Sequence, residues 1–163
     1  MAATQFVECE GQGFWAHDVA LAVFLKHLID VAEASEQANT PWLVTAASEW
    51  RTVACIPSFG LSFNDNWSDE QRHTVVSLAK QACARLSLRE SIPPEEIAEW
   101  QIHDDLRIFL RGATEVLTAP VVELGRAIVA LICGGLPEAP VGHSWFYGTS
   151  TGRQTLKRAG WGQ

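Results

Sequence analysis

The chain has 163 residues and a mass of 17.9 kDa, a size that fits one domain, residues 1–163, with a core stable without metals or disulfide bonds. Hydrophobic residues make up 47% and charged residues 19%, values that exclude intrinsic disorder, collagen-like repeats and coiled coils. The net charge of -7 argues against nucleic acid or an anionic membrane as ligand and favours a basic partner.

The N-terminal residues and the cysteines indicate the compartment. Residues 1–13 contain no Lys or Arg and lead into no long apolar run, so we expect no secretory signal. The four cysteines form no CxxC motif and have no histidine at ligand spacing, which argues against a zinc site or a disulfide framework. Cys55, Cys83 and Cys133 lie among small apolar residues, where a free thiol acts as a small buried hydrophobe. We therefore expect a cytoplasmic protein without metal or cofactor.

The first part of the chain predicts two buried helices. Residues 14–36 carry apolar side chains at helical spacing with charged residues opposite, and should form a long central helix. Thr40 and Pro41 are typical of a helix start, because the Thr oxygen can cap free amides and Pro has no amide hydrogen to leave unbonded. The second helix should bury Trp50 in its apolar stripe and end at Pro57.

The middle of the chain predicts a loop followed by two further helices. Residues 58–67 are rich in Ser, Asn and Asp and predict a packed loop or an irregular hairpin. Ser68 and Gln71 match the capping box that opens a helix. A short fourth helix should begin at Pro94 and run toward Trp100.

The last part of the chain predicts one more helix. In residues 101–112 apolar positions alternate with charged or aromatic ones, a pattern that leaves strand and helix both open. Thr118 begins a helix that Gly134 should terminate, and residues 154–158 can form a short helical turn. The predicted fold class is mainly α: a single helical domain of about five helices with at most a small β element.

One cluster of residues could support chemistry. His103, Asp104 and Asp105 carry groups able to hold a divalent ion or to exchange a proton. Adjacent residues point in different directions, and the sequence indicates no further ligands. We therefore interpret this cluster as a solvated or salt-bridged turn and predict no catalytic residue and no metal ligand.

Negative charge is concentrated in the first two thirds of the chain. Residues 1–50 hold seven acidic residues and one basic residue, whereas residues 106–163 hold three acidic and six basic residues. Exposed carboxylates could form an acidic face that steers a basic partner, and the alternative is an ordinary solvated surface. The candidate partner-binding residues are Glu33, Glu36, Glu49, Glu95, Glu96, Glu99, Asp104 and Asp105.

Four stretches of the sequence carry a resemblance to a known class of proteins. They are residues 13–15 before an apolar helix, residues 103–112 (HDDLRIFLRG), residues 118–128 (TAPVVELGRAI), and residues 145–148 (WFYG) with Gly152 and Arg153. Together they resemble small bacterial proteins found as immunity partners beside polymorphic toxins. The resemblance implies a cytoplasmic protein that binds and blocks one toxin domain, and it carries over no catalytic residue.

The sequence thus favours a non-enzymatic bacterial binding protein, an immunity protein that neutralises a basic toxin domain. One alternative is a small metal-assisted hydrolase that uses His103, Asp104 and Asp105. Another is a structural subunit of a homo-oligomer, such as a homodimer, in which the aromatic residues 145–147 are buried by a second copy. Neither nucleic acid nor a membrane is expected as a partner.

Overall fold

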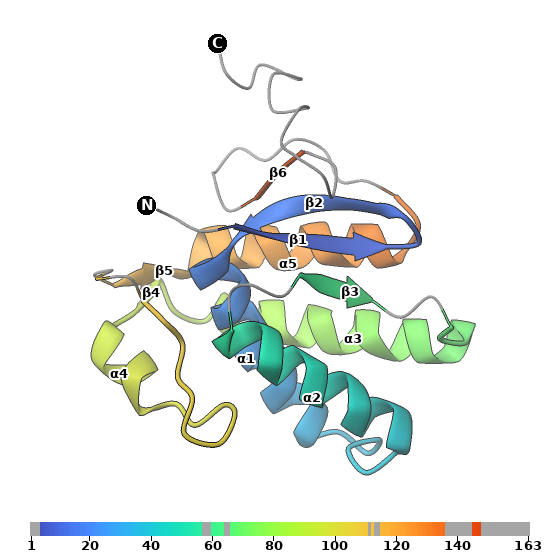
Figure 1. Ribbon diagram of the computed structural model, residues 1–163, viewed down its shortest axis with the longest axis horizontal. Coiled ribbons are helices and arrows are strands. Elements are labelled where there is room, and N and C mark those ends of the chain that lie inside the picture. The colour runs from blue at the N-terminus through green and yellow to red at the C-terminus, as the bar shows by residue number, and fades with distance from the viewer. Residues whose placement is uncertain are drawn as a thin grey trace.

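The fold combines helices with two β-sheets. The computed structural model describes residues 4–56, 60–63, 66–110, 112 and 115–135, together with the backbone of residues 145–147. Within these residues there are five helices and six strands (Figure 1). The fold is therefore α/β, and the prediction of a mainly α domain with at most a small β element is wrong, because β-strands form both near the start of the chain and at residues 145–147.

An antiparallel hairpin opens the described chain. It consists of β1 (Thr4–Cys9) and β2 (Gln12–His17). The turn residues Glu10 and Gly11 have φ values of 52° and 79°, which is the backbone of a two-residue type I′ turn. All residues of β1 pair with residues of β2, from Thr4 with His17 at the open end to Cys9 with Gln12 beside the turn. Because the turn sets this register, it also determines which side chains of the two strands face the helices.

The predicted helix over residues 14–36 includes a strand at its start. Phe14 and Ala16 are buried while Trp15 between them is only half-buried, an alternation with the period of a strand. The helix itself begins at Asp18. Apolar residues stand on both sides of His17 and Asp18, so the start of the helical pattern could not be separated from the end of the strand.

Two more strands complete the sheet from distant parts of the chain. β3 (Leu61–Phe63) pairs with β1 in parallel, and β6 (Trp145–Tyr147) pairs with β2 antiparallel, which gives the order β3-β1-β2-β6. β3 lies in the segment 58–67 that was predicted as a loop or an irregular hairpin. A separate small ladder joins β4 (Ser91–Ile92) to β5 (Val116–Leu117).

The predicted helices are present, and most of their starts are confirmed. They are α1 (Asp18–Glu33), α2 (Pro41–Cys55), α3 (Asp69–Leu86), α4 (Pro94–Glu99) and α5 (Thr118–Ile132). The capping box of α3 is confirmed: the Gln71 amide donates to Ser68 Oγ over 3.1 Å, and the Ser68 amide donates to Gln71 Oε1 over 2.8 Å. The predicted end of α5 is also confirmed, since Gly134 follows it with a φ of 94°.

Two local predictions were wrong in detail. The Thr40 hydroxyl does not cap α2, because it donates to the carbonyl of Gln37 over 2.7 Å. Residues 101–110 and 112 form neither strand nor helix, apart from one isolated bridge between His103 and Leu106. The predicted helical turn at residues 154–158 lies outside the described residues.

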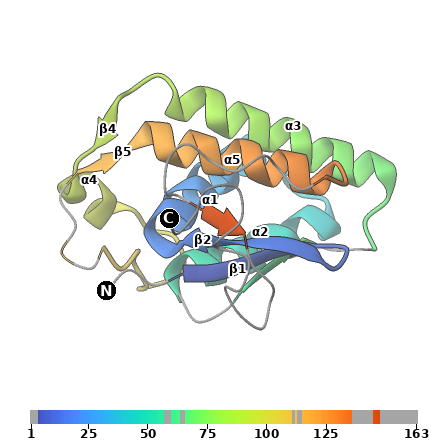
Figure 2. The same cartoon turned by 90° about the horizontal axis from the view of Figure 1, so that it is seen from above.

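α1 is the central element of the core. It contacts α2, α3, α5 and β2, and α5 packs on both strands of the hairpin. Figure 2 shows α3 and α5 side by side, with the hairpin on the other side of α5. Trp50 of α2 is 1% exposed, so its predicted burial is confirmed.

Of the three cysteines that were predicted to be buried, two are buried in the structure. Cys55 and Cys83 are buried, as predicted. Cys133 is exposed, because it caps the end of α5 one residue beyond the last buried position, Ile132. The prediction that Cys133 is a buried thiol is therefore wrong.

Gly125 allows three helices to meet closely. A Cβ atom at this position of α5 would lie 2.5 Å from Cys83 Sγ of α3 and 2.7 Å from the Phe24 ring of α1. Glycine inside a helix costs about 1 kcal/mol relative to alanine. Glycine leaves room for α1 and α3 to pack closely on α5, where no larger residue fits. The close packing of the three helices offsets the cost of the glycine.

We expect Gly125→Ala to lower the free energy of unfolding by about 1 to 2 kcal/mol, because overpacking outweighs the gain in helix propensity. Urea denaturation measures the change. The double variant Cys83→Ala/Gly125→Ala should recover part of the loss, since removal of the thiol makes room for the new methyl group. A single variant more stable than the wild type would show that the three helices do not constrain this position.

Trp50→Ala should lower the free energy of unfolding by about 3 to 5 kcal/mol, because it empties a large volume in the core. The matched control is Val44→Ala on the same helix, where the side chain is 51% exposed and truncation should have little effect. The same denaturation experiment tests both variants. A loss below about 1 kcal/mol for Trp50→Ala would contradict the observed packing of α2.

Candidate protein-binding surface

α4 is a short helix whose start is encoded by proline and acidic residues. Pro94 occupies the first turn, where no amide hydrogen is needed, and Glu95 and Glu96 lie at the positive end of the helix dipole. Ile97 is fully buried and fixes the inner side of the helix. The chain leaves the helical conformation at Trp100.

Trp100 connects α4 to the central helix. The edge of its ring meets His27 at a centroid distance of 5.7 Å, and Lys26 Nζ lies 5.4 Å from the Trp100 ring centroid. Lys26 also forms an ion pair of 2.5 Å with Asp30. His27 Nδ1 is 2.9 Å from the carbonyl of Val23, and because a carbonyl can only accept, the neutral ring carries its proton on Nδ1.

The surroundings of His27 favour its neutral form. Burial lowers the pKa of His27 below its ordinary value, and the nearby cations Lys26 and Arg89 act in the same direction. The hydrogen bond to Val23 and the charge of Asp30 act in the opposite direction but are outweighed. The histidine that Trp100 contacts is therefore neutral at pH 7.

Arg89 fixes α4 from a second side. Its two guanidinium nitrogens donate to both carboxylate oxygens of Glu96 over 2.7 and 2.8 Å, and these hydrogen bonds lower the pKa of Glu96. Glu96 is thus engaged within the chain. Glu95 and Glu99 are exposed, and neither has a basic side chain within ion-pair distance in the described part of the chain.

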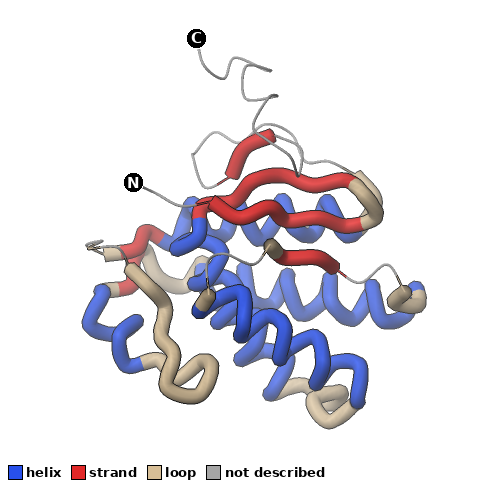
Figure 3. The backbone as a smooth tube through the Cα atoms, viewed as in Figure 1, coloured by secondary structure: helices blue, strands red, loops and turns tan. Residues whose placement is uncertain are grey.

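A tight turn follows α4 in the long loop that Figure 3 shows between α4 and β5. The Leu106 amide donates to the carbonyl of His103 over 2.8 Å. Asp104 adopts a φ of 50°, a conformation that aspartate tolerates better than most residues. The turn leaves the carboxylates of Asp104 and Asp105 exposed. This turn chemistry explains why the segment does not continue as a strand.

The same loop exposes two large apolar side chains. Leu106 is 43% exposed and Phe109 is 59% exposed, while Ile102 and Ile108 are buried and hold the loop to the core. Exposed aromatic and aliphatic side chains beside charged ones are typical of protein interfaces. We call this set the α4-loop surface; it consists of Glu95, Glu99, Asp104, Asp105, Leu106 and Phe109.

The α4-loop surface holds a large share of the negative charge of the chain. Residues 94–110 contain five acidic residues and one basic residue, Arg107, a local net charge of -4 within a total of -7. Residues 94–110 are therefore a short, strongly acidic segment. The segment folds into α4 and a loop that the buried side chains of Ile102 and Ile108 hold to the core.

The remaining predicted partner-binding residues lie on other elements. Glu33 at the end of α1 forms an ion pair with Arg51 of α2. Glu36 is exposed in the connection between α1 and α2, and Glu49 is exposed on α2. Figures 1 and 2 both show the connection between α1 and α2 on the opposite side of the molecule from α4. The eight predicted residues thus come from α1, the connection after it, α2, α4 and the loop after α4, and two of them, Glu33 and Glu96, form ion pairs within the chain.

The described residues contain no group of three or more His, Cys, Asp or Glu side chains placed to hold a metal ion. His103, Asp104 and Asp105 form a surface turn in which His103 is half-buried and both carboxylates are exposed. This agrees with the interpretation of the cluster as a solvated turn. The side chains of residues 145–147 lie outside the description, so the predicted aromatic cluster is placed only as the backbone of β6.

Comparison of the chain with protein-family models, curated protein sequences and solved structures gives no match. In the part of the chain that the structure describes, no helix combines the length and the apolar character needed to cross a bilayer.

The exposed apolar side chains of the α4-loop surface, Leu106 and Phe109, were not predicted from the sequence. Read as a strand, the segment would place Leu106 and Ile108 on one face, yet Leu106 is exposed and Ile108 is buried. The adjacent residues Asp104 and Asp105 were the available signal, because consecutive aspartates favour a turn. The contacts of Trp100 with α1 carried no signal in the sequence, since they join residues 73 positions apart in the chain, His27 and Trp100.

The stability of the protein should fall as the pH drops below the ordinary His27 pKa of 6.5, because the unfolded chain then binds a proton that the folded chain resists. The pKa of His27 is lower in the folded protein than in the unfolded chain. The contribution of neutral His27 to stability is therefore complete above pH 6.5 and is lost as the pH falls toward the pKa of the folded protein. His27→Gln should reduce that loss. Urea denaturation at about pH 7.5 and about pH 5.5 measures it.

The matched control is His73→Gln, at an exposed position on α3. It should show the same decrease in stability with falling pH as the wild type. An equal decrease in the wild type and in His27→Gln would show that His27 does not contribute to the pH dependence of stability.

Proposed function

We propose that this chain is a non-enzymatic bacterial binding protein, an immunity protein that neutralises a basic toxin domain by covering it. The observation that carries the proposal is the α4-loop surface, where exposed carboxylates accompany an exposed leucine and an exposed phenylalanine. The sequence resemblance to immunity partners of polymorphic toxins supports the same function. Such a protein would act in the cytoplasm, where its four free thiols stay reduced.

Each part of the α4-loop surface has a role in the proposed complex. The carboxylates Glu95, Glu99, Asp104 and Asp105 attract a basic partner over a distance and accelerate the encounter. After contact, Phe109 and Leu106 lose water-exposed apolar area, which slows dissociation.

The surface is also held in place before binding. Trp100 packs on His27, Arg89 holds Glu96 by two hydrogen bonds, and Ile108 is buried below the exposed loop residues. Contacts of this kind reduce the conformational entropy that is lost when a complex forms. A preorganised acidic surface suits an inhibitor that must capture a toxin quickly and hold it.

The direct test is co-expression with the product of the adjacent gene. We expect the neighbouring protein to be toxic when expressed alone, to be harmless with this chain, and to purify with it as a complex. A neighbour without toxicity, or a toxic neighbour that this chain neither binds nor neutralises, would overturn the proposal.

Charge reversal on the α4-loop surface should slow association with that toxin. We expect Glu95→Lys/Glu99→Lys to reduce the association rate about tenfold or more at low salt and to weaken its salt dependence, with less effect on dissociation. Glu96 is left unchanged because it holds Arg89. Stopped-flow or surface-based kinetics at several salt concentrations give both rates.

The matched control is Glu36→Lys/Glu49→Lys, which changes the net charge by the same amount on the α1 and α2 side of the molecule. It should slow association much less. Phe109→Ala should mainly accelerate dissociation, whereas Leu117→Ala, an equally exposed position on β5, should not. Equal effects of the two double reversals would mean that the overall charge, and not the α4-loop surface, attracts the partner.

A further inference from the structure

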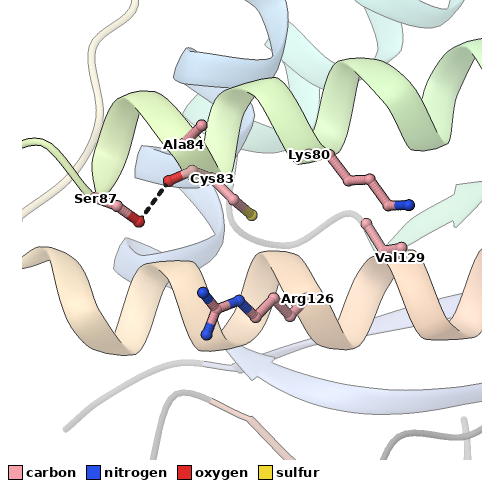
Figure 4. Close-up of a pocket in the computed structure, with 6 residues that line it drawn as sticks. All are labelled: Lys80, Cys83, Ala84, Ser87, Arg126 and Val129. Atoms are coloured by element: carbon pink, nitrogen blue, oxygen red, sulfur yellow. Dashed lines mark hydrogen bonds between the residues drawn. The ribbon is translucent and has the colours of Figure 1, made fainter.

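A groove between α3 and α5 lies outside the α4-loop surface and is unused by the proposed function (Figure 4). Its volume is about 330 Å³, at the lower end of the range for small-molecule sites. The groove is lined from both helices. Lys80, Cys83, Ala84 and Ser87 come from α3 and the loop residue that follows it, and Arg126 and Val129 come from α5.

The groove combines an apolar floor with two cations. Cys83 is buried, Val129 is half-buried, and the methyl group of Ala84 lies beside them. Figure 4 shows Lys80 reaching from α3 toward Val129 at one end of the groove, and Arg126 reaching from α5 the other way, toward the end where Ser87 lies. Both side chains are exposed, and among the described residues neither has a carboxylate within ion-pair distance.

The remaining polar groups of the groove do not balance these charges. The Ser87 hydroxyl donates to the carbonyl of Cys83 over 2.8 Å, so its proton is already used. Burial raises the pKa of the Cys83 thiol, against an opposing effect of Arg126, so the floor is uncharged at pH 7. The groove therefore presents two positive charges and apolar area, although the chain as a whole carries a net charge of -7.

We propose that the groove between α3 and α5 binds a small amphipathic carboxylate, such as a medium-chain fatty acid. The aliphatic chain would lie on Cys83, Ala84 and Val129, where it loses contact with water. The carboxylate would accept hydrogen bonds from Arg126 alone, whose planar guanidinium suits two parallel bonds, because Lys80 points to the other end of the groove. The inference concerns a different surface from the proposed toxin interface and does not depend on it.

Titration of the full-length chain with decanoate tests the proposal, at concentrations below micelle formation. Isothermal calorimetry and NMR chemical-shift mapping should show saturable binding, with shifts at Cys83, Arg126 and Val129. Decanol, which has the same chain without the carboxylate, should bind about tenfold more weakly or worse, because charge-assisted hydrogen bonds are lost.

Variants separate this groove from other sites. Arg126→Met should weaken decanoate binding by about tenfold or more, whereas Lys80→Met, whose charge lies at the other end of the groove, should have a much smaller effect. The matched control Arg85→Met removes an exposed cation of α3 that does not line the groove and should leave affinity unchanged. Val129→Trp should fill the groove and abolish binding, with the fold checked by circular dichroism.

Three results would overturn the inference: no saturable binding of decanoate, equal affinity of Arg126→Met and the wild type, or chemical shifts confined to other surfaces. An acidic peptide that binds the groove more tightly than decanoate would also overturn it, because the occupant would then be a protein segment.

Discussion

The rest of the structure depends on the close contact of α1, α3 and α5 at Gly125. At this point the Phe24 ring and the Cys83 thiol occupy the space that any other residue of α5 would need. The contact places α1 at the centre of the core, and α1 in turn supplies His27 and Lys26, which receive Trp100. The position of the α4-loop surface therefore depends on packing at a glycine of another helix.

The parts of the fold that were predicted correctly are those encoded by local signals. Ser68 and Gln71 form their capping box without help from the rest of the chain, and Gly134 ends α5 because it accepts a positive φ. The strands were missed for the opposite reason. β3 has three residues, and what makes it a strand is its pairing with β1, from which it is separated by two helices.

The sequence predicted the charged residues of the α4-loop surface, but it did not predict how the surrounding side chains are arranged. Glu95, Glu99, Asp104 and Asp105 were identified from composition alone, and they are exposed. Composition could not show that Glu96 binds Arg89 or that Glu33 binds Arg51. Nor could it show that Phe109 faces water while Ile108 next to it is buried, because that difference arises from a turn and not from a regular period.

The order of strands has a consequence for how the protein is made. β2 is synthesised well before its partner β6, which lies at residues 145–147, and all the other helices and strands between them emerge first. Until β6 emerges, one edge of the hairpin offers unpaired backbone groups to any neighbouring strand. Pairings between such distant segments also form slowly. Self-association through this edge of the hairpin therefore competes with folding until β6 pairs with β2.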